Sequence, residues 1–123
     1  MTISKVIQYV DTNKPNAFSN EDKVNWLSEL DAEIAGNIMH MSNADLQNFQ
    51  YDAEDDMDSE LLITFPHDKI YPQFLMARID EMNGEYNRFA NSSVLYNASY
   101  NDFVRWFLET WDPVQGCNAP LEE

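Results

Sequence analysis

The chain has few basic residues. Seven Lys and Arg stand against 22 Asp and Glu in 123 residues, which gives a formal net charge of −15. A surface this negative repels the phosphate backbone of nucleic acids, whose attraction to proteins comes mainly from Lys and Arg displacing counterions. It also repels anionic lipid headgroups. The composition therefore excludes a protein that holds nucleic acid or a membrane by charge, but not one that works beside DNA without gripping it.

Glycine, cysteine and histidine are also scarce. With three glycines in the chain, a Gly-rich loop that cradles phosphate cannot be built. Cys117 is the only cysteine, so it can form neither an internal disulfide nor a cysteine-based zinc site. Neither His40 nor His67 has a second ligand at the spacing of known metal motifs. We therefore expect no catalytic centre, no metal and no cofactor, and hence no enzyme.

Long apolar runs are absent as well. No stretch approaches the roughly 20 residues that a membrane-spanning helix needs. The first residues, MTISKV, lack the basic region and continuous apolar core of a secretory signal. With a single thiol in addition, the sequence predicts a protein made and kept in a reducing cytoplasm, without membrane contact.

What the chain does have is enough apolar and aromatic content to fold, 44% and 13% respectively. We expect one mainly α domain over residues 1–113, a small helical bundle, followed by a C-terminal tail over 114–123. A first helix should be capped by Thr2, and a second should start at Ser19 or Asn20 and end at 41–43. The first helix has an apolar stripe, spaced i, i+3, i+4, i+7, made of Ile3, Val6, Ile7 and Val10.

Residues 43–66 break the helical pattern. Two β-prone runs, 49–51 and 61–65, flank the acidic stretch, the name used below for residues 52–60. This pattern predicts a long acidic loop or a short β-hairpin with a charged tip, between the second helix and the C-terminal helices. The six carboxylates of the acidic stretch are candidate site residues: Asp52, Glu54, Asp55, Asp56, Asp58 and Glu60.

The last part of the domain is helical and aromatic. A helix should start near Tyr71 with Pro72 in its first turn, where the missing N–H costs little. Gly84 and the segment 91–93 are the two candidate breaks, which would give an antiparallel pair, and one continuous helix stays the alternative if neighbouring subunits cover it. Trp111-Asp-Pro113 should end the last helix. Apolar or aromatic side chains recur at heptad spacing among Leu75, Ile79, Met82, Tyr86, Phe89, Ser93, Tyr96, Tyr100, Phe103, Phe107 and Thr110.

Two patterns of carboxylates could in principle form a metal or catalytic site. An EF-hand loop beginning at Asp52 fails, because Met57 stands where glycine is required and Ile63 where a bidentate glutamate is required. A solvated charged loop is the simpler interpretation of the acidic stretch. The pairs Asp31/Glu33 and Asp80/Glu81 are predicted to lie on charged outer helix faces.

The aromatic end of the last helix is the other candidate site. Trp106 and Trp111 lie off the heptad seam, and aromatic side chains are enriched where proteins meet proteins. We place a partner-binding surface at Trp106, Phe107, Trp111 and Pro113, with simple burial inside the domain as the open alternative.

Several short motifs run through nearly the whole chain, from about residue 2 to 113. They are KPN at 14–16, WLSELD at 26–31, ELLI at 60–63 before Pro66, ID at 79–80, NGE at 83–85 and RFANS at 88–92, followed by Asn97, Tyr100 and Phe103. With these motifs the chain resembles the small head–tail connector (adaptor) proteins of tailed bacteriophages and prophages. The motifs are structural and contain no active-site signature.

The resemblance implies a mostly helical protein of the virion neck, made in the host cytoplasm and assembled as a ring, commonly of twelve copies. One side would dock on the portal protein, the other would receive a stopper or tail-completion protein, and DNA would pass through the middle without specific binding. Two alternatives stay open: an acidic DNA-mimic or inhibitor that binds a basic partner, and a small enzyme with an unrecognised carboxylate site.

Overall fold

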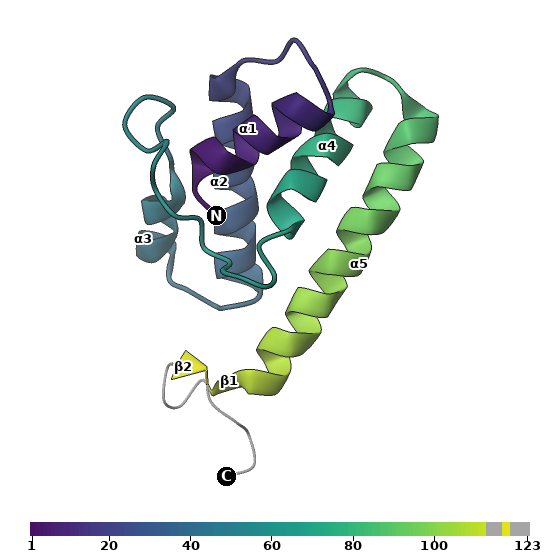
Figure 1. Cartoon of the computed structure of the whole chain (residues 1–123). Coiled ribbons are helices and arrows are strands. Elements are labelled where there is room, and N and C mark those ends of the chain that lie inside the picture. The colour runs from purple at the N-terminus through teal and green to yellow at the C-terminus, as the bar shows by residue number, and fades with distance from the viewer. Residues whose placement is uncertain (113–116, 119–123) are drawn as a thin grey trace.

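A computed structural model describes residues 1–112 and 117–118 of the chain (Figure 1). The described part is mainly α, as predicted, and none of its helices is long and apolar enough to span a membrane. The predicted tail, 114–123, lies outside the described residues except for positions 117 and 118. The elements are α1 (Ile3–Asn13), α2 (Asn20–Asn37), α3 (Asn43–Leu46), the 3₁₀ turn η1 (Gln47–Phe49), α4 (Ile70–Met82), α5 (Tyr86–Thr110) and two paired two-residue strands, β1 (Trp111–Asp112) and β2 (Cys117–Asn118).

The first two helices begin where side-chain caps are available. The Thr2 hydroxyl accepts the Lys5 N–H, and the Ser19 hydroxyl accepts the Asp22 N–H, so each cap satisfies one of the unpaired N–H groups at a helix start. Both starts confirm the prediction. The predicted end of the second helix, at 41–43, is wrong. Helix α2 stops at Asn37, and His40 takes a left-handed backbone conformation (φ 56°).

The segment from 50 to 69 contains no strand, so the predicted hairpin is wrong and its alternative, a long loop, is correct. The N–H groups that would have bonded to a partner strand find other acceptors. The N–H of Leu61 donates to the Met1 carbonyl, that of Leu62 to the Asp31 carboxylate and that of Ile63 to the Tyr71 hydroxyl. Only an isolated bridge between Thr2 and Glu60 resembles β structure here.

Helices α4 and α5 form the predicted antiparallel pair (Figure 1). The turn between them uses Gly84 at φ 73°, a conformation that glycine adopts without strain. The break is therefore at Gly84 and not at the other candidate, 91–93, through which α5 runs unbroken. Ser92 donates its hydroxyl proton to Asp80 on α4, and Ser93 donates to the Ala90 carbonyl. These polar side chains are therefore satisfied on the helix surface without interrupting it.

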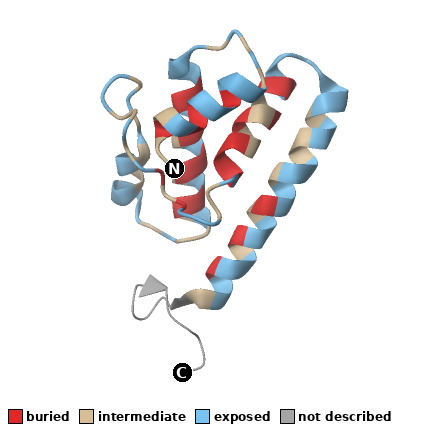
Figure 2. Cartoon of the chain, in the orientation of Figure 1, coloured by how far each residue is buried: buried red, intermediate tan, exposed pale blue. Residues whose placement is uncertain are grey.

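The core lies between α1, α2, α4 and the second half of α5. Figure 2 shows buried positions along α1, α2 and α4, whereas on α5 they begin only at Ser99 and continue with Phe103 and Phe107. Leu61 and Ile63 add the end of the long loop to the same core. The first half of α5 thus packs on α4 along one side and is open to solvent on the other.

Candidate functional site

The acidic stretch, residues 52–60, begins with a closed turn. The Asp52 carboxylate accepts the N–H groups of Glu54 (2.7 Å) and Asp55 (3.1 Å), and its own N–H donates to the Asp56 carboxylate at 2.7 Å. The bonds from the Glu54 and Asp55 N–H groups lower the pKa of Asp52. The turn is therefore built on an ionised carboxylate, and the neighbouring Glu54 and Asp55 side chains are exposed.

The second half of the acidic stretch is bound to the start of α1. The Ser4 N–H donates to the Met57 carbonyl at 2.8 Å, and the Ile3 N–H donates to the Ser59 carbonyl at 3.1 Å. These acceptors use N–H groups at the start of α1, which have no partner inside the helix. The acidic stretch is consequently an ordered surface element, with its carboxylates presented from a fixed backbone.

A buried carboxylate fastens both ends of this loop to the bundle. Asp31 on α2 is fully buried. It accepts the Tyr51 hydroxyl (2.6 Å) and the Leu62 N–H (3.1 Å) on one oxygen, and the Tyr71 hydroxyl (2.7 Å) on the other. Tyr51 precedes the acidic stretch and Leu62 follows it. Asp31 therefore closes the loop at its base.

The Asp31 cluster has unusual electrostatics, because all three donors are neutral. Burial raises the pKa of Asp31, and the hydrogen bonds from Tyr51, Tyr71 and Leu62 offset part of that rise. Burial and the Asp31 charge also raise the pKa of Tyr51 and of Tyr71. Both tyrosines therefore keep their protons and remain donors.

Two of the four paired carboxylates are not where the sequence placed them. Asp31 and Asp80 are buried, whereas Glu33 and Glu81 lie on the exposed surface as predicted. Asp80 accepts the Lys14 ammonium at 2.9 Å and the Ser92 hydroxyl at 2.6 Å. The physical reason is that hydrogen-bond partners from other segments satisfy both groups, which makes burial of a carboxylate tolerable.

The spacing of apolar residues in α2 indicates that Asp31 is buried. Leu27, Leu30, Asp31 and Ile34 are spaced i, i+3, i+4, i+7, and these four positions define one buried helix face. An aspartate at the third of these positions is on the apolar side of the helix. Its partners, Tyr51 and Tyr71, lie 20 and 40 residues further along the chain, so no local pattern could have identified them.

The aromatic end of α5 divides between core and surface. Phe103 and Phe107 are 2% exposed and belong to the core, whereas Trp106 is 37% exposed. The His67 ring lies 4.9 Å from the Trp106 ring and 5.9 Å from the Phe103 ring, between centroids. Of the other two predicted partner-binding residues, Trp111 begins β1 and nothing further is described of it, and Pro113 lies outside the described residues.

A hollow of about 180 Å³ opens beside Trp106. It is formed by the chain after α2, the end of the long loop and the second half of α5. Phe65, on its wall, is 85% exposed, and sequence reasoning gave no role to it or to His67. The residues lining the hollow are Met39, Met41, Leu62, Ile63, Thr64, Phe65, His67, Phe103, Trp106 and Phe107.

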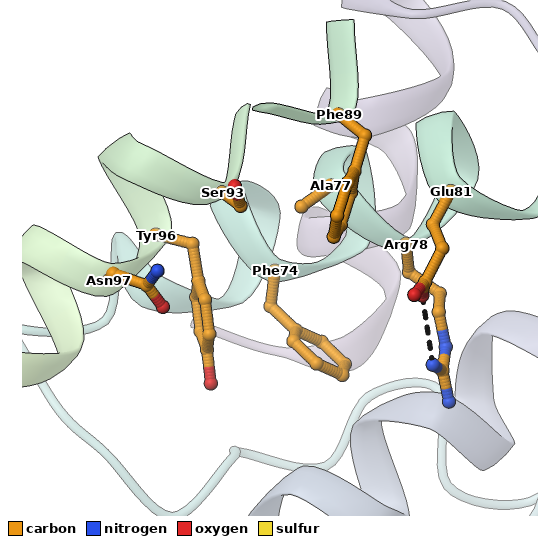
Figure 3. A pocket seen from close by; sticks show the side chains of 8 residues that line it. All are labelled: Phe74, Ala77, Arg78, Glu81, Phe89, Ser93, Tyr96 and Asn97. Atoms are coloured by element: carbon orange, nitrogen blue, oxygen red, sulfur yellow. Dashed lines mark hydrogen bonds and ion pairs between the residues drawn. The ribbon is translucent and has the colours of Figure 1, made fainter. Parts of the chain in front are cut away.

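A second hollow, about 400 Å³, lies between α4 and the first half of α5 (Figure 3). Phe74, Phe89 and Tyr96 give it an aromatic lining. Arg78 and Glu81 stand at one end, joined by an ion pair of 3.3 Å. The Arg78 guanidinium also lies 5.7 Å from the Trp26 ring centre, so it is already engaged by neighbours within the chain.

The described residues contain no group of three or more His, Cys, Asp or Glu placed to hold a metal ion. What they offer instead is an ordered anionic surface, two aromatic hollows and a well-packed bundle between them. Comparison with known proteins adds no relative: no protein-family model, curated protein or solved structure matches this chain.

Proposed function

We propose that this protein is a structural head–tail connector (adaptor) of a phage neck. In this function it forms a ring, commonly of twelve copies, that joins the portal protein to a stopper or tail-completion protein and lets DNA pass. The observation that carries the proposal is the separation of two different surfaces. The acidic stretch lies beside α1 and α2, and α5 lies on the opposite side of the bundle (Figure 1).

The acidic stretch suits the wall of a DNA channel. Six carboxylates within nine residues repel phosphate, so DNA that passes them meets no cationic group to hold it. The bonds from Ser4 and Ile3 to the Met57 and Ser59 carbonyls keep the stretch against the bundle. An ordered loop of this kind would line an opening without closing it.

The aromatic end of α5 suits a docking site for another neck protein. Trp106 and Phe65 are exposed beside an apolar hollow, and large aromatic side chains in such positions carry much of the binding energy at protein interfaces. Trp106 and Phe107 were predicted to form a partner-binding surface. We assign the contact to Trp106 and the support beneath it to Phe107, which is 2% exposed.

A second candidate function follows from the order of the acidic stretch. Because Asp52 and Asp56 hold the turn in one conformation, its carboxylates are presented at fixed spacing, as a DNA-mimic or inhibitor of a basic protein would require. Such a protein would act as a monomer or dimer and would bind its partner more weakly as salt rises.

The decisive experiment is electron microscopy and mass measurement of the purified protein, alone and with the portal protein of the same phage. Rings on the portal, and the protein in the neck of purified virions, are the expected results. A protein that binds no neck component and instead captures a basic protein would overturn the adaptor function. Replacing the six acids of 52–60 with Asn and Gln separates the two candidates: assembly should survive in an adaptor, whereas a mimic should lose its partner.

A further inference from the structure

Exposed apolar side chains concentrate on α5. Among the described residues, eight large apolar or aromatic side chains are exposed, and five of them belong to this helix. Val94 is 66% exposed, Leu95 60% and Leu108 59%. We call the surface formed by Val94, Leu95 and Leu108 the outer face of α5.

The outer face points away from the bundle. Val94 and Leu108 are about four helical turns apart, which places them on the same side of the helix. Phe103 and Phe107 point the other way, into the core. The side of α5 remote from α4 is almost entirely exposed in Figure 2. The helix has 25 residues and is therefore about 37 Å long, so half of its surface measures roughly 600 Å². This area is close to the ~800 Å² that each partner contributes to a standard protein–protein interface.

The outer face is also free of the chain's excess charge. Within α5, Arg88 and Arg105 balance Asp102 and Glu109, so two bases and two acids leave a net charge of zero, and the other 98 residues carry the whole −15. Arg105 is paired with Asp102 at 2.7 Å. Helix α1 is balanced too, with one base and one acid, but Tyr9 is its only exposed large apolar side chain.

From these three observations we infer that the outer face of α5 is where a second copy of this chain binds. Two chains that each carry −15 repel one another wherever their acidic surfaces approach. A surface that exposes apolar side chains and carries no net charge is the one on which that repulsion is least and the gain from burial is greatest. A basic partner would be attracted to the acidic stretch instead. The inference goes beyond the proposed ring, because the outer face lies on the side of the bundle opposite the acidic stretch (Figure 1): there a second copy can bind without bringing the two acidic stretches together.

The test is the oligomeric state of the full chain, measured by sedimentation velocity and light scattering over a range of concentrations, alone and on the portal protein. The test variant is V94D/L95D, and the matched control is Tyr9→Asp on α1, which replaces another exposed apolar side chain. All three positions are at least 48% exposed, so each variant should fold, as far-UV circular dichroism will verify. We expect V94D/L95D to weaken self-association at least tenfold and the control to leave it unchanged.

Salt gives a second readout. Because the contact has no net charge while the rest of the chain repels, wild-type association should strengthen when NaCl rises from about 50 mM to 500 mM, as screening shortens the Debye length from ~14 Å to ~4 Å. If wild-type assembles and V94D/L95D assembles equally well, the inference is overturned and the adaptor function stands. If wild-type stays monomeric in solution at every concentration, the inference is overturned, whereas rings on the portal protein would still uphold the adaptor function.

Discussion

Replacing Tyr71 with phenylalanine removes a single oxygen atom from the centre of the protein. That oxygen donates to Asp31 at 2.7 Å and accepts the Ile63 N–H at 2.7 Å, and Tyr71 is 0% exposed. The substitution therefore takes one donor from a buried carboxylate and leaves a buried N–H without an acceptor.

The expected cost follows from the two lost bonds. A hydrogen bond to a charged group contributes about 1.5–3 kcal/mol, and a buried N–H left unpaired costs about 1–3 kcal/mol. Because the ring still fills its space, we expect the free energy of unfolding to fall by about 3–4 kcal/mol. That is a large part of the 5–15 kcal/mol typical of a domain, and it should lower Tm by roughly 10–20 °C.

Urea unfolding followed by far-UV circular dichroism will measure the change, at one protein concentration for all variants because self-association adds to apparent stability. Tyr51→Phe removes only one donor, from a half-buried ring, and should cost about 1–2 kcal/mol. Tyr9→Phe, at an exposed position, serves as the control and should change nothing. A Tyr71→Phe loss below about 1 kcal/mol, or one no larger than that of Tyr51→Phe, would refute the role given to the Asp31 cluster.

Three further predictions concern other buried or strained positions. Burial raises the pKa of Asp31, so at a pH between its unfolded and folded pKa the folded protein holds a proton that the unfolded chain has lost. Relative to Asp31→Asn, the free energy of unfolding of wild-type should therefore fall as pH rises from about 4 through the folded pKa, and then level off. Urea titrations across pH will show it, and a difference that rises with pH would contradict it. Lys14→Met should lower the free energy of unfolding by about 2–3 kcal/mol, since Asp80 is 1% exposed; a thermal melt indistinguishable from wild-type would exclude this. Gly84→Ala should cost about 1 kcal/mol for its left-handed backbone, whereas Gly36→Ala, inside α2, should be neutral or stabilising in the same assay.

The sequence was most informative where local chemistry decides the structure. Thr2 and Ser19 have hydroxyls that cap the helices they precede, and Gly84 is the residue type that a left-handed turn favours. Pro72 fits the first turn of α4, where its missing N–H breaks no bond. Such features depend on a few neighbouring residues, so they can be read without knowledge of the fold.

The sequence was least informative where partners outside the segment itself determine its conformation. The run 61–65 is β-prone, yet N–H groups in it bond to Met1 and Asp31, which are far away in the sequence, and to the side chain of Tyr71 on the next helix. The segment 91–93 appeared to be a break because Asn and Ser favour turns, but the α4 surface, with Asp80 as acceptor for Ser92, keeps it helical. In the candidate site, the composition predicted the charge of the acidic stretch. Its order could not be predicted, because it depends on contacts with the start of α1.

The closure of the long loop by Asp31 has a consequence for how this protein can vary. One carboxylate holds Tyr51 before the acidic stretch and Leu62 after it, so the chain leaves and rejoins the bundle at the same two points whatever lies between. Side chains at Glu54 and Asp55 face solvent, and changing them alters no packed atom. Substitutions at these exposed positions could therefore change the surface chemistry of the acidic stretch during evolution, while the fold of the helical bundle stays the same.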